Sequence, residues 1–233
     1  MAAHRCALIR GRRRHNAAMG NEQFPATRVE YGDEPLARAD MPDDPIALFS
    51  AWLAAAEAAK VNEPNAMALA TCGADGQPHC RIVLLKLLDE RGFTFFTNKQ
   101  SEKGEQLLVN PRAAATFWWH LPRNRQVRIT GSMEHSSEAV SDRYFAARPR
   151  RAQLCSAASP QSRRVGSRAE LEQLVEALSQ RVGAGPVPRP AHWGGYVLLP
   201  RTIEFWQGRD ARLHDRFRYT RTEHAWSLER LAP

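Results

Sequence analysis

Three side chains near the end of the sequence have the types and spacing of an anion-binding site. Arg212, His214 and Arg216 stand at alternate positions in the stretch 204–217. In an extended segment, alternate side chains leave the same face, so two permanent cations would flank an imidazole there. Such a group suits an anionic ligand. An exposed edge strand kept soluble by charge explains the spacing equally well, and this stretch alone leaves both interpretations open.

A second pair of cations lies on an apolar stretch. Arg81 and Lys86 enclose the run Ile-Val-Leu-Leu and are five positions apart. Five is odd, so in a regular strand the two side chains would face opposite sides. A buried cation needs a partner, and each one therefore could meet its own anion. The alternative is two cations at strand ends whose charged heads reach water.

Several weaker signals for phosphate are spread along the chain. Ser101 opens a helix that contains Lys103, and a helix N-terminus suits an anion. Tyr144 and Arg148 are four apart and so share a helix face, and the loop segment 161–164 reads Gln-Ser-Arg-Arg. Each signal alone has an ordinary structural explanation, but together they suggest more than one phosphate. There is no GxGxxG and no P-loop, so we expect a barrel that binds a phosphorylated ring cofactor.

The elements that must position these residues alternate between strand and helix periods. Helices are expected over 43–60, 101–109, 136–148 and 168–182, with a loop over 156–167 and a Gly/Pro linker over 183–190. Strands are expected over 66–72, 80–88, 93–97, 113–120, 125–134, 194–199, 201–207, 212–219 and 224–230. Short connections between the first strands favour an antiparallel sheet or barrel, so we predict a β-barrel with peripheral helices (α+β).

Composition narrows the classes of function. The chain has 233 residues and a net charge of +8, but its first 20 residues carry five arginines and no acid. The remainder, with 28 bases and 25 acids, does not indicate a nucleic-acid-binding protein. No apolar run is long enough to span a bilayer. We expect residues 1–42 to form a flexible leader, with Met19 as an alternative start, and residues 43–233 to form one domain.

The four cysteines, Cys6, Cys72, Cys80 and Cys155, form no CxxC pair and have no histidine cluster at zinc spacing. We therefore expect no metal site. The interpretation we favour is reduced thiols in a cytoplasmic protein, where they act as small buried hydrophobic residues.

Taken in order, these stretches resemble the pyridoxine/pyridoxamine 5′-phosphate oxidase family over about 28–233. The matching motifs are Arg-Ile-Val-Leu-Leu-Lys at 81–86, Phe-Phe-Thr-Asn at 95–98, Asn-Arg-Gln-Val at 124–127, Tyr-Phe-x-x-Arg-Pro at 144–149, Gln-Ser at 161–162, Ile-Glu-Phe-Trp-Gln-Gly at 203–208, Arg-Leu-His-Asp-Arg-Phe at 212–217 and a terminal Leu-Ala-Pro. Each motif is weak by itself, but all of them in one order are highly specific.

The resemblance implies an antiparallel FMN-binding split barrel that works as a homodimer, with FMN at the subunit interface. It implies oxidation of pyridoxine or pyridoxamine 5′-phosphate to pyridoxal 5′-phosphate, with dioxygen reduced to hydrogen peroxide. The cofactor would supply the redox chemistry and the protein would supply position and charge. Another split-barrel flavoprotein, such as a flavin reductase, is the alternative, and a non-enzymatic binding module ranks below it.

The resemblance also implies roles for single residues. FMN would contact Arg81, Ile82, Val83, Leu84, Leu85, Lys86, Phe96, Thr97, Lys103, Gln126, Gln161, Ser162, Trp206 and Arg216. The substrate would contact Arg28, Tyr31, Lys86, Tyr144, Arg148, Arg212, Leu213 and His214. Arg81 and Lys103 would chiefly hold the FMN phosphate, while Lys86, Tyr144 and Arg148 would hold the substrate phosphate. Arg212 and His214 are the expected catalytic residues, and 28–31 would close over the substrate as a lid.

Three positions depart from the family pattern. Glu102 stands where a second cation is common, Ala152 replaces a serine that helps to hold the substrate phosphate, and Arg163 follows Gln-Ser where a small serine is common. We expect these changes to shift the affinity for FMN or substrate without removing the reaction.

Overall fold

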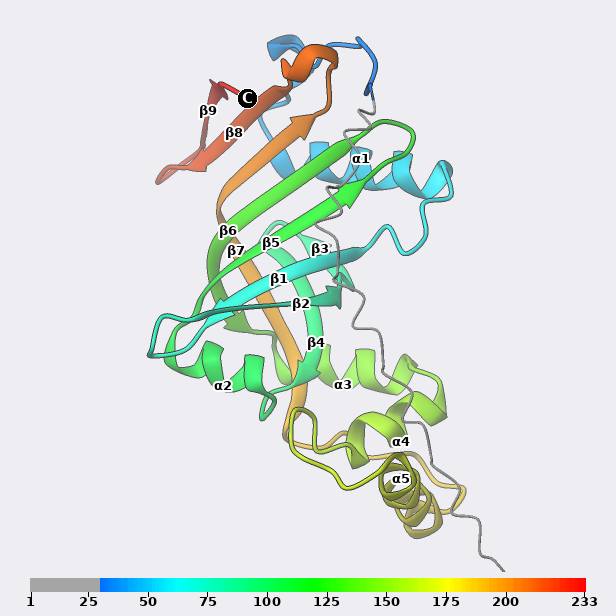
Figure 1. The fold of residues 1–233 in the computed structure, drawn as a ribbon. Coiled ribbons are helices and arrows are strands. Elements are labelled where there is room, and N and C mark those ends of the chain that lie inside the picture. Colours follow the sequence, from blue (N-terminus) through cyan, green and yellow to red (C-terminus); the bar gives the residue numbers. More distant parts are fainter. Residues whose placement is uncertain (1–29) are drawn as a thin grey trace, which may run out of the picture.

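The computed structural model describes residues 30–233, and Figure 1 shows their course. The helices are α1 (Pro45–Ala58), α2 (Glu102–Val109), α3 (Glu138–Ala147), α4 (Arg150–Ala158) and α5 (Arg168–Val182), with 3₁₀ turns η1 (Arg38–Asp40) and η2 (Asp210–Arg212). The strands are β1 (Ala66–Cys72), β2 (Pro78–Leu84), β3 (Leu87–Asp89), β4 (Gly92–Asn98), β5 (Arg112–Trp119), β6 (Arg125–His135), β7 (Trp193–Gln207), β8 (Asp215–Arg221) and β9 (Trp226–Leu231).

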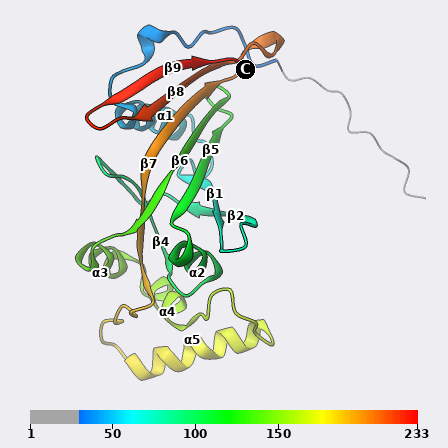
Figure 2. The ribbon, with the colours of Figure 1, turned by 90° about the vertical axis from the view of Figure 1, so that its left-hand side faces the viewer.

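All the strands join one antiparallel sheet, in the order β2-β1-β5-β6-β7-β4-β3, with β8 on β7 and β9 on β8. β7 organises this sheet because its two halves have different neighbours. Its first half pairs with β4 and its second half with β8, while β6 follows both. The sheet curls into a split barrel, with β8–β9 at one end and α3–α5 at the other, as Figures 1 and 2 both show. The predicted fold class is therefore confirmed.

A bulge lets β6 and β7 bend together. The register between them shifts at Thr130/Gly131, opposite Pro200. A Cβ atom on Gly131 would lie 1.9 Å from the carbonyl oxygen of Leu199, so only glycine allows this approach. The bend carries β7 from the helical end of the molecule to the β8–β9 end.

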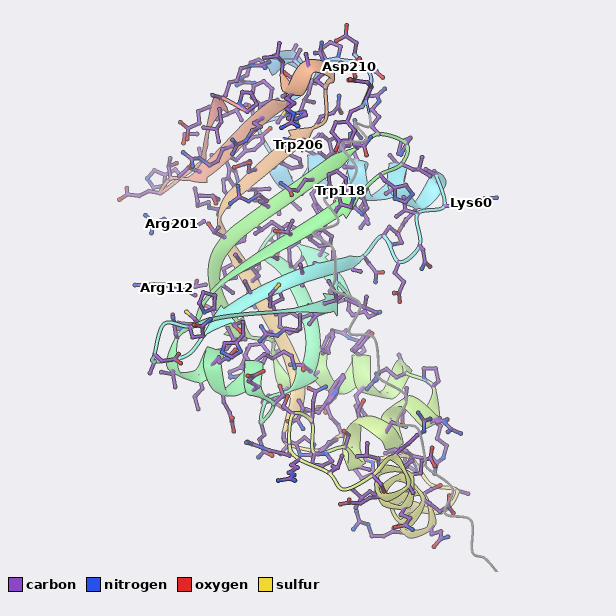
Figure 3. All side chains as sticks on the ribbon, in the orientation of Figure 1. Lys60, Arg112, Trp118, Arg201, Trp206 and Asp210 are labelled. Atoms are coloured by element: carbon purple, nitrogen blue, oxygen red, sulfur yellow. The ribbon has the colours of Figure 1, made fainter. Side chains whose placement is uncertain are left out.

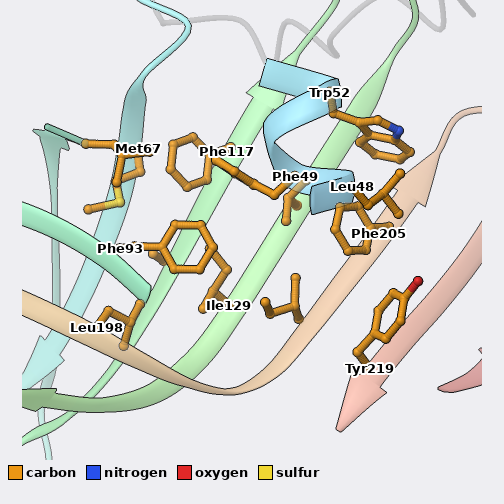
Figure 4. Packing of buried hydrophobic residues seen from close by; sticks show 14 of the residues in the cluster. Leu48, Phe49, Trp52, Met67, Phe93, Phe117, Ile129, Leu198, Phe205 and Tyr219 are labelled. Atoms are coloured by element: carbon orange, nitrogen blue, oxygen red, sulfur yellow. The ribbon is translucent and has the colours of Figure 1, made fainter. Parts of the chain in front are cut away.

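The main core lies between α1 and the concave face of the sheet (Figure 4). Asp44 caps α1 by accepting a hydrogen bond from the Ile46 amide at 2.8 Å. Phe49 packs edge-on against Phe93 and Phe117, with ring centroids 4.9 and 4.8 Å apart. Burial of such rings contributes strongly to folding, and the residues that α1 turns inward include Leu48, Phe49, Trp52 and Ala56.

Most predicted elements are confirmed, but one strand prediction over 80–88 is wrong. The chain forms β2 and then β3, with Leu85 and Lys86 between them. At this break the backbone changes partners, because the Leu85 amide donates to the carbonyl of Asn65 and the Lys86 amide to that of Thr94. The parity argument for Arg81 and Lys86 assumed a regular strand and therefore fails.

Three further boundaries differ from the expectations. Strands 194–199 and 201–207 are one strand, because Pro200 falls at the bulge. A helix, α4, covers part of the expected loop 156–167. The strand predicted over 212–219 begins only at Asp215, since Ala211 and Arg212 adopt left-handed φ angles of 54° and 61° that a strand does not allow.

Two composition-based expectations bear on the described residues. Within 30–233 no helix is both long enough and apolar enough to cross a membrane. The thiols of Cys72, Cys80 and Cys155 are free. Cys80 is exposed, so its expected burial is wrong; Cys6 lies outside the described residues.

Candidate active site

A cavity of about 540 Å³ opens between β2, β4, α2, α3, α4 and the loop that follows α4. We call it the basic cavity, because Arg81, Lys86, Lys103 and Arg148 line it. It brings together most of the predicted ligand-binding residues, namely Arg81, Ile82, Val83, Leu84, Lys86, Phe96, Thr97, Lys103, Tyr144, Arg148, Gln161 and Ser162. Leu85 is not among them, since its side chain is buried in the main core.

Lys103 is a buried cation with neutral partners. Its Nζ donates to the hydroxyls of Thr97 (3.2 Å) and Ser101 (3.0 Å) and to the side-chain oxygen of Gln161 (3.1 Å). Only 8% of the residue is exposed. Burial, with a smaller contribution from Arg81, lowers the pKa of Lys103 to about 8, although Glu102 opposes the shift. An anion at this point would stabilise the charged form of the lysine and raise its pKa.

Arg81 lies at the same end of the cavity and is fixed by its own strand neighbours. Its Nη1 donates to the Thr71 hydroxyl at 2.6 Å and to the Leu69 carbonyl at 3.2 Å, and Nη2 donates to Gln106 at 3.3 Å. These acceptors are neutral. Glu102 lines the cavity too, but its carboxylate pairs with His79 at 3.1 Å.

The loop after α4 places Gln161 and Ser162 over Lys103. Gln161 contacts both Lys103 and the Thr97 hydroxyl (3.0 Å), and Ser162 adopts a left-handed φ of 68°. Arg163 forms an ion pair with Glu105 of α2 and donates to the Gln100 carbonyl. The departure at Arg163 thus ties this loop to the N-terminal part of α2.

The other end of the cavity combines rings and a second cation. Phe96, Tyr144 and Trp193 stack nearly parallel, with the Phe96 and Tyr144 centroids 4.1 Å apart. The Arg148 guanidinium lies 5.0 Å from the centre of a Trp193 ring and donates to Ser156 at 2.7 Å. Burial lowers the pKa of Arg148 and raises that of Tyr144. The cavity therefore contains two separate groups of donors suited to anions.

The remaining predicted residues gather at the opposite end of the molecule, and we call them the C-terminal cluster: Tyr31, Gln126, Trp206, Arg212, Leu213, His214 and Arg216. Figure 3 shows Trp206 and Asp210 there, at the β8–β9 end. None of these seven residues lines the basic cavity. Arg28 lies outside the described residues.

The register of the strands explains why three residues of the C-terminal cluster lie on one face of the sheet. Gln126, Trp206 and Arg216 are directly opposite one another on β6, β7 and β8, so their side chains share one face. Trp118 on β5 extends the same row, and its ring centroid lies 5.8 Å from that of Trp206. Trp118 is 48% exposed.

The lid segment and His214 meet in this cluster. The Tyr31 ring lies 6.0 Å from that of Trp206 and 5.8 Å from that of His214. A Cβ atom on Gly208 would come within 2.8 Å of the Tyr31 ring, so a glycine permits this contact. The Arg209 amide donates to His214 Nδ1 at 3.0 Å, which leaves the proton of the neutral imidazole on Nε2. Burial, followed by the nearby Arg212, lowers the pKa of His214.

The expected alternation of Arg212, His214 and Arg216 on one strand face is wrong. Arg212 belongs to η2, His214 precedes β8, and only Arg216 lies in the strand. Arg216 also has an internal partner, because its Nε and Nη2 donate to Glu204 at 3.1 and 3.0 Å. The turn that leads into β8 places His214 and Arg216 at the same end of the molecule.

Two protein-family models match this chain. Residues 53–181 match the family model for pyridoxamine 5′-phosphate oxidase, and residues 193–233 match the model for the pyridoxine 5′-phosphate oxidase C-terminal dimerisation region. The chain belongs to the pyridoxamine 5′-phosphate oxidase family. The basic cavity lies mostly within the first region, and the C-terminal cluster lies mostly within the dimerisation region.

Individual relatives agree with the family match. The chain is 53% identical over 209 residues to a pyridoxine/pyridoxamine 5′-phosphate oxidase of Salinibacter ruber, covering 88% of this chain and 97% of that protein. A Burkholderia cenocepacia protein of the same name has the same identity and coverage. Among solved structures, PhzG from Burkholderia lata 383, in complex with tetrahydrophenazine-1-carboxylic acid, superposes with a TM-score of 0.80 at 33% identity. It covers 87% of this chain and 100% of that chain. A pyridoxamine 5′-phosphate oxidase-related protein from Nostoc punctiforme shares the fold, with a TM-score of 0.65 at 18% identity and coverage of 80% and 96%.

Proposed function

We propose that two copies of this chain bind FMN and oxidise pyridoxine 5′-phosphate or pyridoxamine 5′-phosphate to pyridoxal 5′-phosphate. With the alcohol, two electrons and two protons pass to dioxygen and give hydrogen peroxide. With the amine, water also enters and ammonia leaves.

One observation carries this proposal: the basic cavity holds two groups of cations that lack a neutralising carboxylate. Among residues 30–233, Lys103 and Arg81 have neutral hydrogen-bond partners at one end. Arg148, near Tyr144, contacts only the Ser156 hydroxyl and a Trp193 ring face within this described part of the chain, and Lys86 lines the same cavity. A buried cation is costly unless an anion pairs with it. Two phosphates, one from a cofactor and one from a substrate, would satisfy both groups.

The donor set fits the phosphate of FMN. Lys103, Arg81, Gln161 and Ser162 would hold that phosphate, and Phe96 and Trp193 offer ring faces in the same cavity. FMN, when bound, would accept a hydride from the substrate and pass the electrons to dioxygen. The chain itself would contribute binding, orientation and charge.

The C-terminal cluster supports a homodimer. It lies at the far end of the same protomer from the basic cavity and within the family's dimerisation region (Figures 1 and 3). In a twofold dimer the cluster of one protomer can face the cavity of its partner. Gln126, Trp206 and Arg216 would then complete the FMN site.

Arg212, Leu213 and His214 would meet the substrate across that interface. The imidazole of His214, with its proton on Nε2, can donate a hydrogen bond to the hydroxyl or amine of the substrate. Arg212 would add a permanent charge near the ring. Tyr31, already in contact with Trp206 and His214, would help to exclude water.

The direct test is a peroxide assay on purified protein with each phosphorylated vitamer, read beside the flavin absorbance. We expect yellow protein and equal amounts of peroxide and pyridoxal 5′-phosphate. A colourless protein that cannot be loaded with FMN, or a flavoprotein inactive on both esters, would overturn the proposal.

A complementation experiment tests the shared site. Lys103→Met damages the basic cavity and His214→Ala damages the C-terminal cluster, so each homodimer has two defective sites. Unfolding and refolding the two variants together should restore about a quarter of wild-type activity, because half of the dimers are mixed and each has one intact site. If the mixture is no more active than its components, the two regions do not meet across an interface.

The alternative is another split-barrel flavoprotein, either a flavin reductase or an enzyme that acts on a ligand like that of PhzG. Such a protein would keep the Lys103 end of the cavity but would not require the cation group at Lys86 and Arg148. Peroxide formation from tetrahydrophenazine-1-carboxylic acid or from NADH, with neither ester oxidised, would favour it.

A further inference from the structure

Ser156, in the last turns of α4, lies at the Arg148 end of the basic cavity. Its hydroxyl oxygen accepts a hydrogen bond from Arg148 Nη1 at 2.7 Å, and the same guanidinium stacks over Trp193. Gln153 fixes the start of this helix by donating to the carbonyls of Ala146 (3.0 Å) and Arg148 (2.8 Å). Arg148 and Ser156 therefore form a fixed pair rather than two independent surface side chains.

The hydroxyl proton of Ser156 has no acceptor within residues 30–233. A serine inside a helix commonly donates to the carbonyl four residues earlier, as Ser50 of α1 does to Ile46 at 2.9 Å. Ser156 makes no such bond to the carbonyl of Ala152, and its oxygen is already used by Arg148. The free donor of this half-buried hydroxyl is therefore available to a ligand in the cavity that it lines.

A phosphate monoester is the ligand that this end of the cavity suits. It carries two negative charges near neutral pH and three strong acceptor oxygens, so it needs several converging donors. Lys86, Tyr144 and Arg148 line the cavity together with Ser156. The Ser156 hydroxyl, held at this end by Arg148, adds a neutral donor to the two cations and the phenol.

We propose that Ser156 binds the phosphate of the ester substrate and sets the enzyme's preference for phosphorylated over free vitamers. Ala152 and Ser156 are one helical turn apart on the same face of α4, but only Ser156 lines the cavity. The chain thus places its hydroxyl donor one turn beyond the position at which the family resemblance implies a serine. This inference rests on the proposed function of the same cavity.

The test uses FMN-loaded wild type and Ser156→Ala with pyridoxine 5′-phosphate and with unphosphorylated pyridoxine. We expect KM for the ester to rise roughly 5- to 20-fold, near the lower end of the range for loss of one hydrogen bond to a charged group, because the other donors of the cavity remain. The kcat should stay within about twofold. KM for pyridoxine should not change, so the discrimination between the two substrates falls by the same factor. Alanine favours the helix, so the variant should fold.

Ser50→Ala is the matched control, because Ser50 is also a helical serine but lies in α1, away from the cavity. It should leave both KM values unchanged. If Ser156→Ala raises KM equally for ester and alcohol, or for neither, Ser156 is not a phosphate ligand.

A binding measurement separates this inference from the proposed function. Should wild type oxidise neither ester, the proposed reaction fails, and titration with pyridoxal 5′-phosphate then tests Ser156 directly. Binding that weakens 5- to 20-fold in Ser156→Ala supports the phosphate contact. Binding that is equal in both proteins, or absent from wild type, overturns it.

Discussion

The basic cavity and the C-terminal cluster are both rich in cations, but they neutralise them differently. Within residues 30–233, Arg81, Lys103 and Arg148 in the cavity have only neutral hydrogen-bond partners. In the C-terminal cluster Arg216 pairs with Glu204, and beside the cluster Arg209 pairs with Asp33 and Asp215 and Arg230 with Asp215. Arg212 is the exception, since it forms no ion pair with a carboxylate of residues 30–233.

This difference separates two uses of a charged side chain. A cation that already has a carboxylate partner mainly fixes structure, and here it holds the 31–36 segment and the η2 turn against β8. A buried cation without such a partner destabilises the free protein and gains most from an external anion. The unpaired cations of the cavity should therefore respond to mutation mainly through ligand affinity, and the carboxylate-paired cations in and beside the C-terminal cluster mainly through stability.

The largest expected effect is at Lys103. Lys103→Met removes the buried charge and keeps most of the apolar volume, so FMN should bind roughly 10- to 150-fold more weakly, as for loss of a charge-assisted hydrogen bond. The FMN-free variant should be at least as stable as wild type, because the cost of burying the charge disappears. Fluorescence titration with FMN and thermal melting of both proteins measure the two effects. A variant that loses stability and keeps its flavin affinity would contradict the comparison.

Mutation of Asp215, which lies beside the C-terminal cluster, should instead lower the stability of the protein. Its carboxylate accepts from the Leu36 amide at 3.0 Å and pairs with Arg230 and Arg209. Asp215→Asn should lower the free energy of unfolding by about 2 kcal/mol, since it leaves two arginines without their shared partner. Urea denaturation at fixed protein concentration measures this, with the fully exposed Glu223→Gln as control.

Acid should remove the stability difference between wild type and Asp215→Asn. Burial by itself would raise the pKa of Asp215, but hydrogen bonds from Leu36, Arg230 and Arg209 outweigh it and lower the pKa below its usual value. The stabilisation is therefore present above the unfolded-state pKa, near 4, and is lost as pH falls through the lower folded-state value. A gap between wild type and Asp215→Asn that stays constant into strong acid would contradict this account.

These two regions also show what the sequence could predict. Strands with one buried face, such as β1, and capped helices, such as α1, follow directly from residue period and capping residues. The motifs lie on separate local elements, and the structure brings many of their residues together in the basic cavity, while the roles of these residues stay predictions.

The strand predictions are wrong where tertiary contacts determine the backbone conformation. No sequence signal in 80–88 predicts that the hydrogen-bond partner changes from Asn65 at Leu85 to Thr94 of β4 at Lys86. No signal in 210–214 predicts the left-handed φ angles of Ala211 and Arg212. Likewise the row formed by Trp118, Gln126, Trp206 and Arg216 depends on the register of four strands. Ser156 was missed because α4 itself was not predicted.

A further prediction concerns the pH dependence of FMN binding, with an effect of about tenfold per pH unit at most. The pKa of Lys103 in the FMN-free protein is lowered to about 8, and a bound phosphate would raise it. Above pH 8 binding must therefore take up a proton, so FMN affinity should fall as pH rises through 8 and stay nearly level below it.

Lys103→Arg sharpens this test, because its guanidinium stays charged at all the pH values used. Its FMN affinity should be nearly independent of pH between 7 and about 10, whatever its absolute value. The same slope in both proteins would assign the titration to another group.

The smallest expected effect comes from Glu102, the one acid that lines the basic cavity. It pairs with His79 and is more than half exposed, so it repels an incoming phosphate only moderately. Glu102→Gln should tighten FMN binding by roughly two- to fivefold, in the range of exposed charge interactions, and added salt should reduce the gain. Glu134→Gln is the matched control and should have no effect, because it removes an equally exposed acid of β6 that pairs with Arg91 in the β3–β4 turn. If Glu102→Gln leaves the flavin affinity unchanged or weakens it, Glu102 does not reduce the binding of the phosphate. The contrast between the basic cavity and the C-terminal cluster would then rest on Lys103 and Arg81 alone.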